Sequence, residues 1–207
     1  MILNIEDFKR MFLKSCELLE DNVDTLSEID SKFGDGDHGV TIGKISGVIR
    51  ESIVNHNEDS IKGFLEIMGD KIMNVNGGSA GPLWGTFIVG LSEGIEEEKE
   101  INEENLKDML LASLINMQLI TKAKVGDKTM MDVLIPVVNG ARYSKEKLPE
   151  LLRDIAASAA KGAEDSKNYV AKFGRARFYK EQTLGYMDAG AMSLSLLFKG
   201  WAEALGV

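Results

Sequence analysis

The sequence lacks several features that would each indicate a particular class of protein. Cys16 is the single cysteine in 207 residues, which excludes an internal disulfide and a cysteine-rich metal site. A lone cysteine also suits the reducing cytoplasm, where we expect the protein to act. Met1 to Arg10 has no cationic start followed by an apolar run, and no stretch of about 18 apolar residues occurs in the chain. We therefore predict neither secretion nor a membrane-spanning segment.

Basic blocks are missing as well. The formal net charge is −9, and no cluster of lysine and arginine offsets it, which argues against nucleic-acid binding. The alternation of apolar and polar residues that marks a half-buried strand does not occur, and no Ser/Pro-rich linker divides the chain. Residues 1–207 are therefore predicted to form a single domain, long enough for one well-buried core.

Nearly every long segment has helical periodicity instead. Asn4 is a good N-cap for the first apolar pattern, and Thr129 with Asp132 has the T-x-x-D spacing of a capping box. The second apolar pattern continues the spacing of the first, so these two are counted together, and we predict an all-α bundle of about eight helices. The predicted helices cover residues 5–19, 23–33, 40–53, 61–73, 83–95, 102–117, 129–138, 148–173 and 191–205.

Glycines cluster at four junctions between the predicted helices. The chain has 21 glycines, and the junctions are 34–39, 77–85, Gly126 and 185–190. At any one junction the glycines could simply end a helix, but each junction also carries polar residues suited to ions or phosphates. Alternate loops of an up-and-down bundle lie at the same end, and these junctions follow every second helix. We therefore predict that the four junctions share one rim.

The first junction concentrates charged side chains. Asp30, Asp35, Asp37 and His38 lie within nine residues, and Gly34 is placed to end the preceding helix. Three carboxylates repel one another, and Asp30 would face the negative end of that helix's dipole. A bound cation best explains this arrangement. Carboxylate oxygens without cysteine favour a hard ion, and Mg²⁺ usually accompanies phosphates. The sequence therefore points to phosphoryl chemistry.

Three familiar motifs do not fit these junctions. Residues 34–39 match G-x-G-x-x-G, but a dinucleotide-binding fingerprint must follow a strand, and the preceding residues are helical in pattern. An EF-hand starting at Asp35 would have Val40 where glycine is required and Ser46 where glutamate is required. Gly126 and Lys128 resemble a P-loop, but an aspartate separates them and no glycine stands five residues before Gly126.

The second junction has the composition of an anion site. Pro82 suits the first turn of a helix, and Ser79 or Gly81 is placed near its cap. The glycines of residues 77–85 would let backbone N–H groups approach a phosphate, which the positive end of a helix also favours. The alternative is an ordinary tight corner between two helices.

Four motifs in order resemble one known family. They are G-D-G-D-H-G, G-G-S-x-G-P-L-x-G, G-D-K-T-M-x-D and G-R-A…G-x-x-D-x-G-A, and they extend over about residues 5–205. This set is similar to that of the ADP-binding L subunit of bacterial dihydroxyacetone kinases. The resemblance implies an eight-helix antiparallel up-and-down barrel that holds a nucleotide at one rim.

The resemblance also implies roles for individual residues. Asp30, Asp35 and Asp37 would ligate two Mg²⁺ ions that bridge the phosphates of ADP or ATP. The charge balance of three aspartates, ADP and two ions further suggests that Lys128 and Arg175 supply positive charge. Asp188 could equally be only an N-cap. By the resemblance, His38 and Thr41 would contact phosphate oxygens, Met130 would line the adenine side, and Arg175 would close over the site. The nucleotide-binding positions implied by the resemblance or by charge balance are His38, Thr41, Gly78, Ser79, Ala80, Lys128, Met130, Arg175, Asp188, Ala189 and Gly190.

Three positions depart from the family pattern without removing a metal ligand. Ala80 lacks a hydroxyl that is common there, Thr121 stands where glycine often occurs, and Ala189 replaces the usual proline. These departures leave room for a sugar other than dihydroxyacetone. The family's arrangement implies a phosphotransferase subunit that serves dihydroxyacetone held on a separate K subunit, with ADP rephosphorylated by a phosphohistidine-carrying subunit. An ATP-dependent kinase subunit for another ketose and a non-catalytic, nucleotide-sensing protein that binds partners are the alternatives.

Overall fold

The computed structural model describes residues 1–56 and 60–207, and in these ranges the fold is helical. Leu3 and Ile101 form a single antiparallel bridge, and the described residues contain no longer strand. The α-helices are α1 (Ile5–Asp21), α2 (Val23–Ser31), α3 (His38–Asn55), α4 (Ile61–Met73), α5 (Ala80–Glu93), α6 (Glu103–Ile120), α7 (Met131–Tyr143), α8 (Leu148–Asp165) and α9 (Ala189–Ala204). Two 3₁₀ segments, η1 (Ser166–Asn168) and η2 (Arg175–Thr183), lie between α8 and α9.

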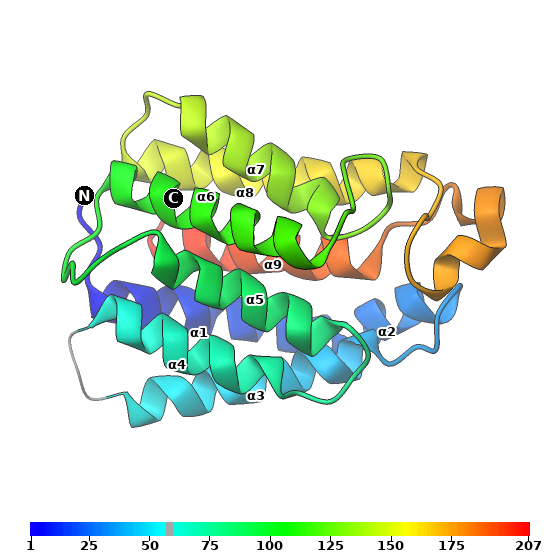
Figure 1. Ribbon diagram of the computed structural model, residues 1–207, viewed down its shortest axis with the longest axis horizontal. Coiled ribbons are helices and arrows are strands. Elements are labelled where there is room, and N and C mark those ends of the chain that lie inside the picture. The colour runs from blue at the N-terminus through cyan, green and yellow to red at the C-terminus, as the bar shows by residue number, and fades with distance from the viewer. Residues whose placement is uncertain (57–59) are drawn as a thin grey trace.

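The helices run to and fro along the long axis of the molecule (Figure 1). Contacts join α1 to α3 and then connect each helix to the next from α3 to α9. Helix α9 also packs against α1, so the contacts form a cycle of eight helices. Helix α2 follows α1 after Asn22 and packs against α3 and α9. The predicted all-α class is confirmed, whereas the up-and-down barrel stays a prediction.

Aromatic side chains fill the interior between these helices. Phe12 of α1 makes edge-to-face contacts with Phe64 of α4, at a centroid distance of 6.1 Å, and with Trp201 of α9, at 5.8 Å. Phe198 continues this chain from Trp201, at 5.2 Å, to Phe87 of α5, at 6.0 Å. Such pairs contribute about 0.5–1.5 kcal/mol each beyond the burial of their area. The core therefore ties together helices that are distant in sequence.

Local capping explains where several helices begin. The Asn4 side chain accepts hydrogen bonds from the N–H groups of Glu6 and Asp7, and the Asp7 carboxylate accepts one from Asn4 N–H. The prediction that Asn4 caps α1 is therefore confirmed. Thr129 and Asp132 form only half of the predicted capping box. The Asp132 carboxylate accepts from Thr129 N–H, but the Thr129 hydroxyl accepts from Met131 N–H, and α7 starts at Met131.

The predicted end of the eighth helix was wrong. Periodicity extended it to Phe173, whereas α8 ends at Asp165 and is followed by η1 and an irregular segment. The carbonyl groups of Ser166 and Tyr169 accept hydrogen bonds from the Lys128 ammonium, and that of Ser166 also accepts from Tyr169 N–H in η1, in place of the bonds of a longer α-helix. A contact across 38 residues therefore overrides the local helical pattern.

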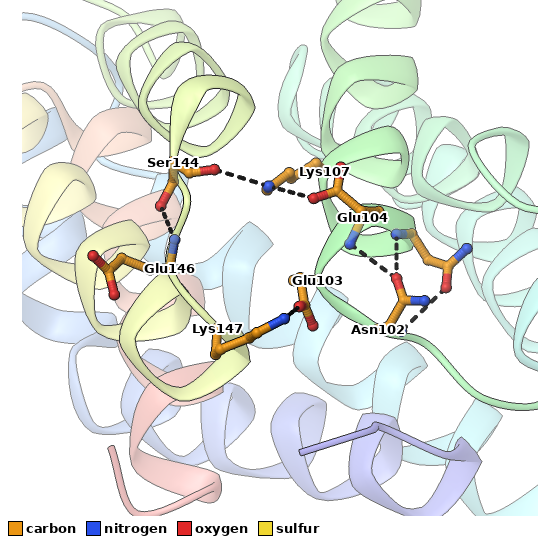
Figure 2. Close-up of polar contacts among 8 residues, drawn as sticks. Asn102, Glu103, Glu104, Lys107, Ser144, Glu146 and Lys147 are labelled. Carbon is orange, nitrogen blue, oxygen red and sulfur yellow. Dashed lines mark hydrogen bonds and ion pairs between the residues drawn. The ribbon is translucent and has the colours of Figure 1, made fainter.

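Polar contacts close the end of the bundle where α6 begins (Figure 2). The Lys107 ammonium of α6 donates to the carbonyl group of Ser144, just after α7, at 2.9 Å. Lys147, at the start of α8, pairs with Glu103 of α6. These contacts join α6 to the turn between α7 and α8. Within the described parts of the chain, no helix combines the length and hydropathy needed to cross a bilayer.

Candidate metal and anion site at the helix rim

The four glycine-containing junctions gather at one end of the molecule, as predicted (Figure 1). Helices α2, α4, α6 and α8 end there, and α3, α5, α7 and α9 begin there. The helix dipole favours an anion at the start of a helix, as do N–H groups where they are left unpaired. This end, which we call the rim, therefore brings four helix N-termini together.

Three carboxylates meet at the rim. Asp30 comes from the last turn of α2, and Asp35 and Asp37 come from the junction before α3. One oxygen atom from each lies within 4.8 Å of the others. The Asp30 Oδ2 atom is buried and has no hydrogen-bond partner, which is unusual for a carboxylate oxygen. A divalent cation would satisfy this oxygen, so the residues present fit a metal such as Mg²⁺.

Gly34 allows this close approach. A Cβ atom at Gly34 would lie 2.3 Å from Asp30 Oδ1 and 2.9 Å from the Asp30 carbonyl oxygen. Gly34 N–H also donates to that carbonyl group at 2.6 Å. Any larger residue would therefore displace the Asp30 carboxylate.

Arg175 is the cation that faces these acids. Its guanidinium, from the start of η2, forms an ion pair with Asp35. The hydrogen bond from Arg175 is the main reason that the pKa of Asp35 is lowered. Burial, followed by repulsion from Asp35 and Asp30, raises the pKa of Asp37. Arg175 thus lies beside the acidic site with an exposed side chain that contacts an acid, and its role at the nucleotide stays a prediction.

His38 is the first residue of α3 and faces α9. Its Nε2 atom is 3.0 Å from the hydroxyl oxygen of Ser193, and its ring is hydrogen-bonded to the backbone of Ala189. Burial lowers the pKa of His38, against the attraction of Asp30. A neutral ring at this position can exchange a hydrogen bond with a ligand or with Ser193. Ser193 was missed because a buried serine within an apolar helix carries no distinctive sequence signal.

The second predicted phosphate region lies at the start of α5. Gly78 and Ser79 are exposed, and the Ser79 side chain makes no capping hydrogen bond, so both are open to a ligand. Ala80 is the first residue of α5. Thr41 is only 1% exposed, and its hydroxyl lies where a Cβ atom of Gly77 would be, at 2.0 Å. Thr41 therefore supports this loop, and its predicted phosphate contact is not accessible in this structure.

The start of α9 forms the third side of the rim. The Asp188 carboxylate accepts a hydrogen bond from Ala191 N–H at 2.8 Å, so Asp188 is an N-cap. Burial raises the pKa of Asp188 to about 7. A Cβ atom on Gly190 would lie 3.7 Å from Met130 Cβ, which places the predicted adenine-side residue next to this turn. Met130 itself is 5% exposed.

Lys128 is not free to contact phosphate in this structure. Its ammonium donates to the carbonyl groups of Ser166, Tyr169 and Tyr186, and a lysine has only three N–H donors. The prediction that Lys128 supplies charge to the phosphates is therefore not favoured by its geometry. These acceptors have no signal in the sequence, because they are backbone groups far along the chain.

This arrangement defines a class of site. A cluster of carboxylates suited to a divalent cation lies at the same end of the molecule as four helix N-termini suited to an anion, and His38 and Arg175 lie close to the carboxylates. Such a combination fits a metal-complexed, phosphate-containing ligand.

Comparison with known proteins identifies the family. Residues 32–203 match the DAK2 domain, and the chain belongs to this family. It is 30% identical over 182 residues to the PEP-dependent dihydroxyacetone kinase 1, ADP-binding subunit DhaL, of Listeria innocua, covering 88% of this chain and 87% of that protein. It is also 31% identical over 189 residues to the L-erythrulose kinase of Pectobacterium atrosepticum, covering 89% of this chain and 32% of that protein.

Solved structures show the same fold. The native dihydroxyacetone kinase of C. freundii matches with a TM-score of 0.75 and 26% identity over 94% of this chain. The complex of that enzyme with AMP-PNP and Mg²⁺ matches with a TM-score of 0.69 and 25% identity. This chain spans about a third of the C. freundii chain, 34% in the native structure.

Proposed function

We propose that this protein is the nucleotide-carrying subunit of a dihydroxyacetone kinase. The observation that carries the proposal is the meeting of Asp30, Asp35 and Asp37 within 4.8 Å, with one buried carboxylate oxygen unpaired, at a rim of helix N-termini. The name of the Listeria relative as an ADP-binding subunit, and the nucleotide and Mg²⁺ in the C. freundii complex, support this interpretation.

At the rim, some residues would bind the metal ions and others would bind the phosphates. Asp30, Asp35 and Asp37 would hold two Mg²⁺ ions. The exposed N–H groups around Gly78 and Ser79, with Ala80 behind them, would receive phosphate oxygens. When bound, Mg²⁺ would neutralise phosphate charge, and the nucleotide would carry the transferred phosphoryl group.

The remaining side chains would orient the ligand. His38 can donate a hydrogen bond to a phosphate oxygen in place of its contact with Ser193. Met130 would line the adenine side next to Ala189 and Gly190. Once metal ions compensate the charge of the acids, Arg175 would move from Asp35 to the phosphates, with which its guanidinium can form the same kind of charge-assisted contact.

The acceptor is proposed to be dihydroxyacetone held on a separate, sugar-binding K subunit. The Listeria relative is named as one subunit of a PEP-dependent kinase, which supports a multi-subunit system. In this scheme ADP stays bound and is rephosphorylated by a phosphohistidine on a third subunit, in the cytoplasm. A second candidate is an ATP-dependent kinase subunit for another ketose, which the similarity to an L-erythrulose kinase favours.

The nucleotide carried by the purified protein tests the proposal. We expect nearly stoichiometric ADP by chromatography of the acid-released fraction, and Mg²⁺-dependent rebinding of ADP after its removal with a chelator. Equal affinity for ADP with and without Mg²⁺ would contradict the carboxylate site. Asp154→Asn, in the exposed middle of α8, loses one negative charge outside the carboxylate site, as replacement of Asp30, Asp35 or Asp37 by asparagine does within it. This control should bind ADP and Mg²⁺ as the wild type does.

The same preparation separates the two candidate functions. If ADP is a resident cofactor, labelled ATP should exchange slowly, and sugar phosphate should form with a K subunit only when a phosphohistidine donor is supplied. Exchange within seconds, together with ATP-driven turnover on dihydroxyacetone or another ketose, would support the ATP-dependent kinase instead. Nucleotide binding without transfer to any ketose would favour a nucleotide-sensing role.

A further inference from the structure

The side chain of Lys128 is almost completely buried at the rim, with 5% of the residue exposed. Its Nζ atom donates hydrogen bonds to the carbonyl oxygens of Ser166, at 2.7 Å, and Tyr169, at 3.3 Å, and to that of Tyr186. These three acceptors use every N–H donor that the ammonium has. These hydrogen bonds compensate the burial of the charge, so the three acceptors fix the position of the ammonium.

The three carbonyl groups belong to the two ends of one loop. Ser166 and Tyr169 begin the segment between α8 and α9, and Tyr186 lies near its end. One ammonium therefore joins both ends of the 166–186 loop to the α6–α7 junction. The preceding residue, Asp127, reinforces this junction, because its carboxylate pairs with Lys172 at 2.6 Å and its carbonyl group accepts from Lys172 N–H.

The backbone at Lys128 is also unusual. Its φ angle of +60° lies in the left-handed region, which residues with a Cβ atom rarely adopt. Such a conformation persists only where the surroundings hold it in place. Here the surroundings include the three carbonyl groups and the acids Asp132 and Asp188, whose charges oppose the lowering of the Lys128 pKa by burial.

The closed loop carries groups that the proposed function requires. Arg175, paired with Asp35, lies within it, and Asp188, the N-cap of α9, follows it directly. The hydroxyl of Ser166, next to the carbonyl group held by Lys128, accepts a hydrogen bond from Asp188 N–H at 2.9 Å. The position of Lys128 is therefore linked through Ser166 to the turn at the start of α9.

We propose that Lys128 is a positioning residue that holds the 166–186 loop closed over the rim by binding its backbone, rather than a residue that contacts the nucleotide. That a nucleotide lies under this loop rests on the proposed function, whereas the closure of the loop by Lys128 does not. Loss of the ammonium would remove a donor from all three carbonyl groups, and only that of Ser166 would keep another, Tyr169 N–H, so the loop should open more often.

Hydrogen exchange of the nucleotide-free protein tests the closure. Lys128→Met should speed amide exchange in residues 167–187 at least tenfold and leave α1 and α4 unchanged. Lys107→Met is the matched control, because Lys107 also donates to a backbone carbonyl group, that of Ser144 (Figure 2), where α6 begins at the end of the bundle opposite the rim (Figure 1). It should leave the loop unchanged. The proposal would be overturned if the loop of Lys128→Met exchanged its amide hydrogens at the wild-type rate, or if Lys107→Met speeded the exchange of the loop as much as Lys128→Met does.

Nucleotide kinetics then separate positioning from direct contact. With a fluorescent ADP analogue and Mg²⁺, Lys128→Met should release the nucleotide at least tenfold faster, with an association rate within about threefold of wild type, because an open loop no longer retains the ligand. Affinities for AMP and ADP should fall by the same factor. A loss confined to ADP would indicate a phosphate contact and reject the positioning role.

Two further results keep the outcomes distinct. Lys128→Gln, which is neutral but keeps two N–H donors, should give exchange and release rates between those of the wild type and Lys128→Met. If Lys128→Met does not fold, Lys128→Gln takes its place in both experiments. A wild-type protein that binds no nucleotide would refute the proposed function while the exchange results still decide the closure.

Discussion

Replacing Asp30 by asparagine should stabilise the ligand-free protein and weaken its response to Mg²⁺ and ADP. The substitution keeps the size of the side chain, which matters because Asp30 Oδ1 packs closely against Gly34. It removes one of three negative charges whose oxygen atoms lie within 4.8 Å of one another. It also removes a charge from the last turn of α2, at the negative end of the helix dipole.

The size of the effect follows from these distances. Two unit charges at the 4.8 Å limit repel by about 0.9 kcal/mol in water, so two neighbours contribute about 1.7 kcal/mol. Physiological salt reduces this to about 1 kcal/mol, and the helix dipole adds about 0.3–1 kcal/mol. The ion pair of Asp35 with Arg175 favours the lower part of this range. A gain of about 1–2 kcal/mol should raise the melting temperature by about 2–8 °C.

Thermal unfolding in a chelator, and then in Mg²⁺ with ADP, measures both effects. Ligand at a hundredfold excess over Kd should stabilise the wild type by about 2.7 kcal/mol and Asp30→Asn by much less, so the order of the two melting temperatures should reverse. Asp154→Asn, with the same change in net charge, should match the wild type in both conditions. A lower melting temperature of Asp30→Asn in the chelator, or an undiminished gain from the ligand, would refute the reasoning.

Three other predictions concern packing, pH and reactivity. Gly200→Ala should destabilise the fold by about 1–3 kcal/mol, because its Cβ atom would lie 2.5 Å from Ser15 Cα. Gly47→Ala, with open space around it, should stabilise α3 by about 0.5–1 kcal/mol. Chemical denaturation measures both changes. The raised pKa of Asp188, about 7, means that the folded state keeps a proton that the unfolded chain releases near pH 4. Wild-type stability should therefore fall between about pH 4 and 7 relative to Asp188→Asn, as read from melting temperatures across that range. The buried thiol of Cys16, whose pKa burial raises to about 12, should react with a thiol reagent only after unfolding.

The fold was predictable to the extent that local patterns decide it. Asn4 caps α1 as its sequence indicates, and the predicted ranges locate every α-helix of the described residues to within a few positions, except at the ends of α7 and α8. The end of α8 depends on Lys128, which lies 38 residues before Ser166. Helical periodicity carries no information about such a contact, so the long Ala-rich pattern was extended too far.

The site was predictable where charges are close in sequence. The repulsion among Asp30, Asp35 and Asp37 indicated a cation site, and the structure brings their oxygens together. The family resemblance placed Arg175 over this site, charge balance gave it a compensating role, and in the structure it pairs with Asp35. For Lys128 the same reasoning stays a prediction that this geometry does not favour, because net charge does not show whether backbone carbonyl groups already satisfy an ammonium.

The first and last residues of the described chain lie at the end of the bundle opposite the rim (Figure 1). A tag, a surface tether or a fluorescent reporter joined to either end would therefore point away from the carboxylates and the helix N-termini. Attachment through the ends would orient every molecule on a sensor surface with its rim toward the solution. Partner proteins and small ligands could then be compared on one immobilised preparation, without any substitution in the chain.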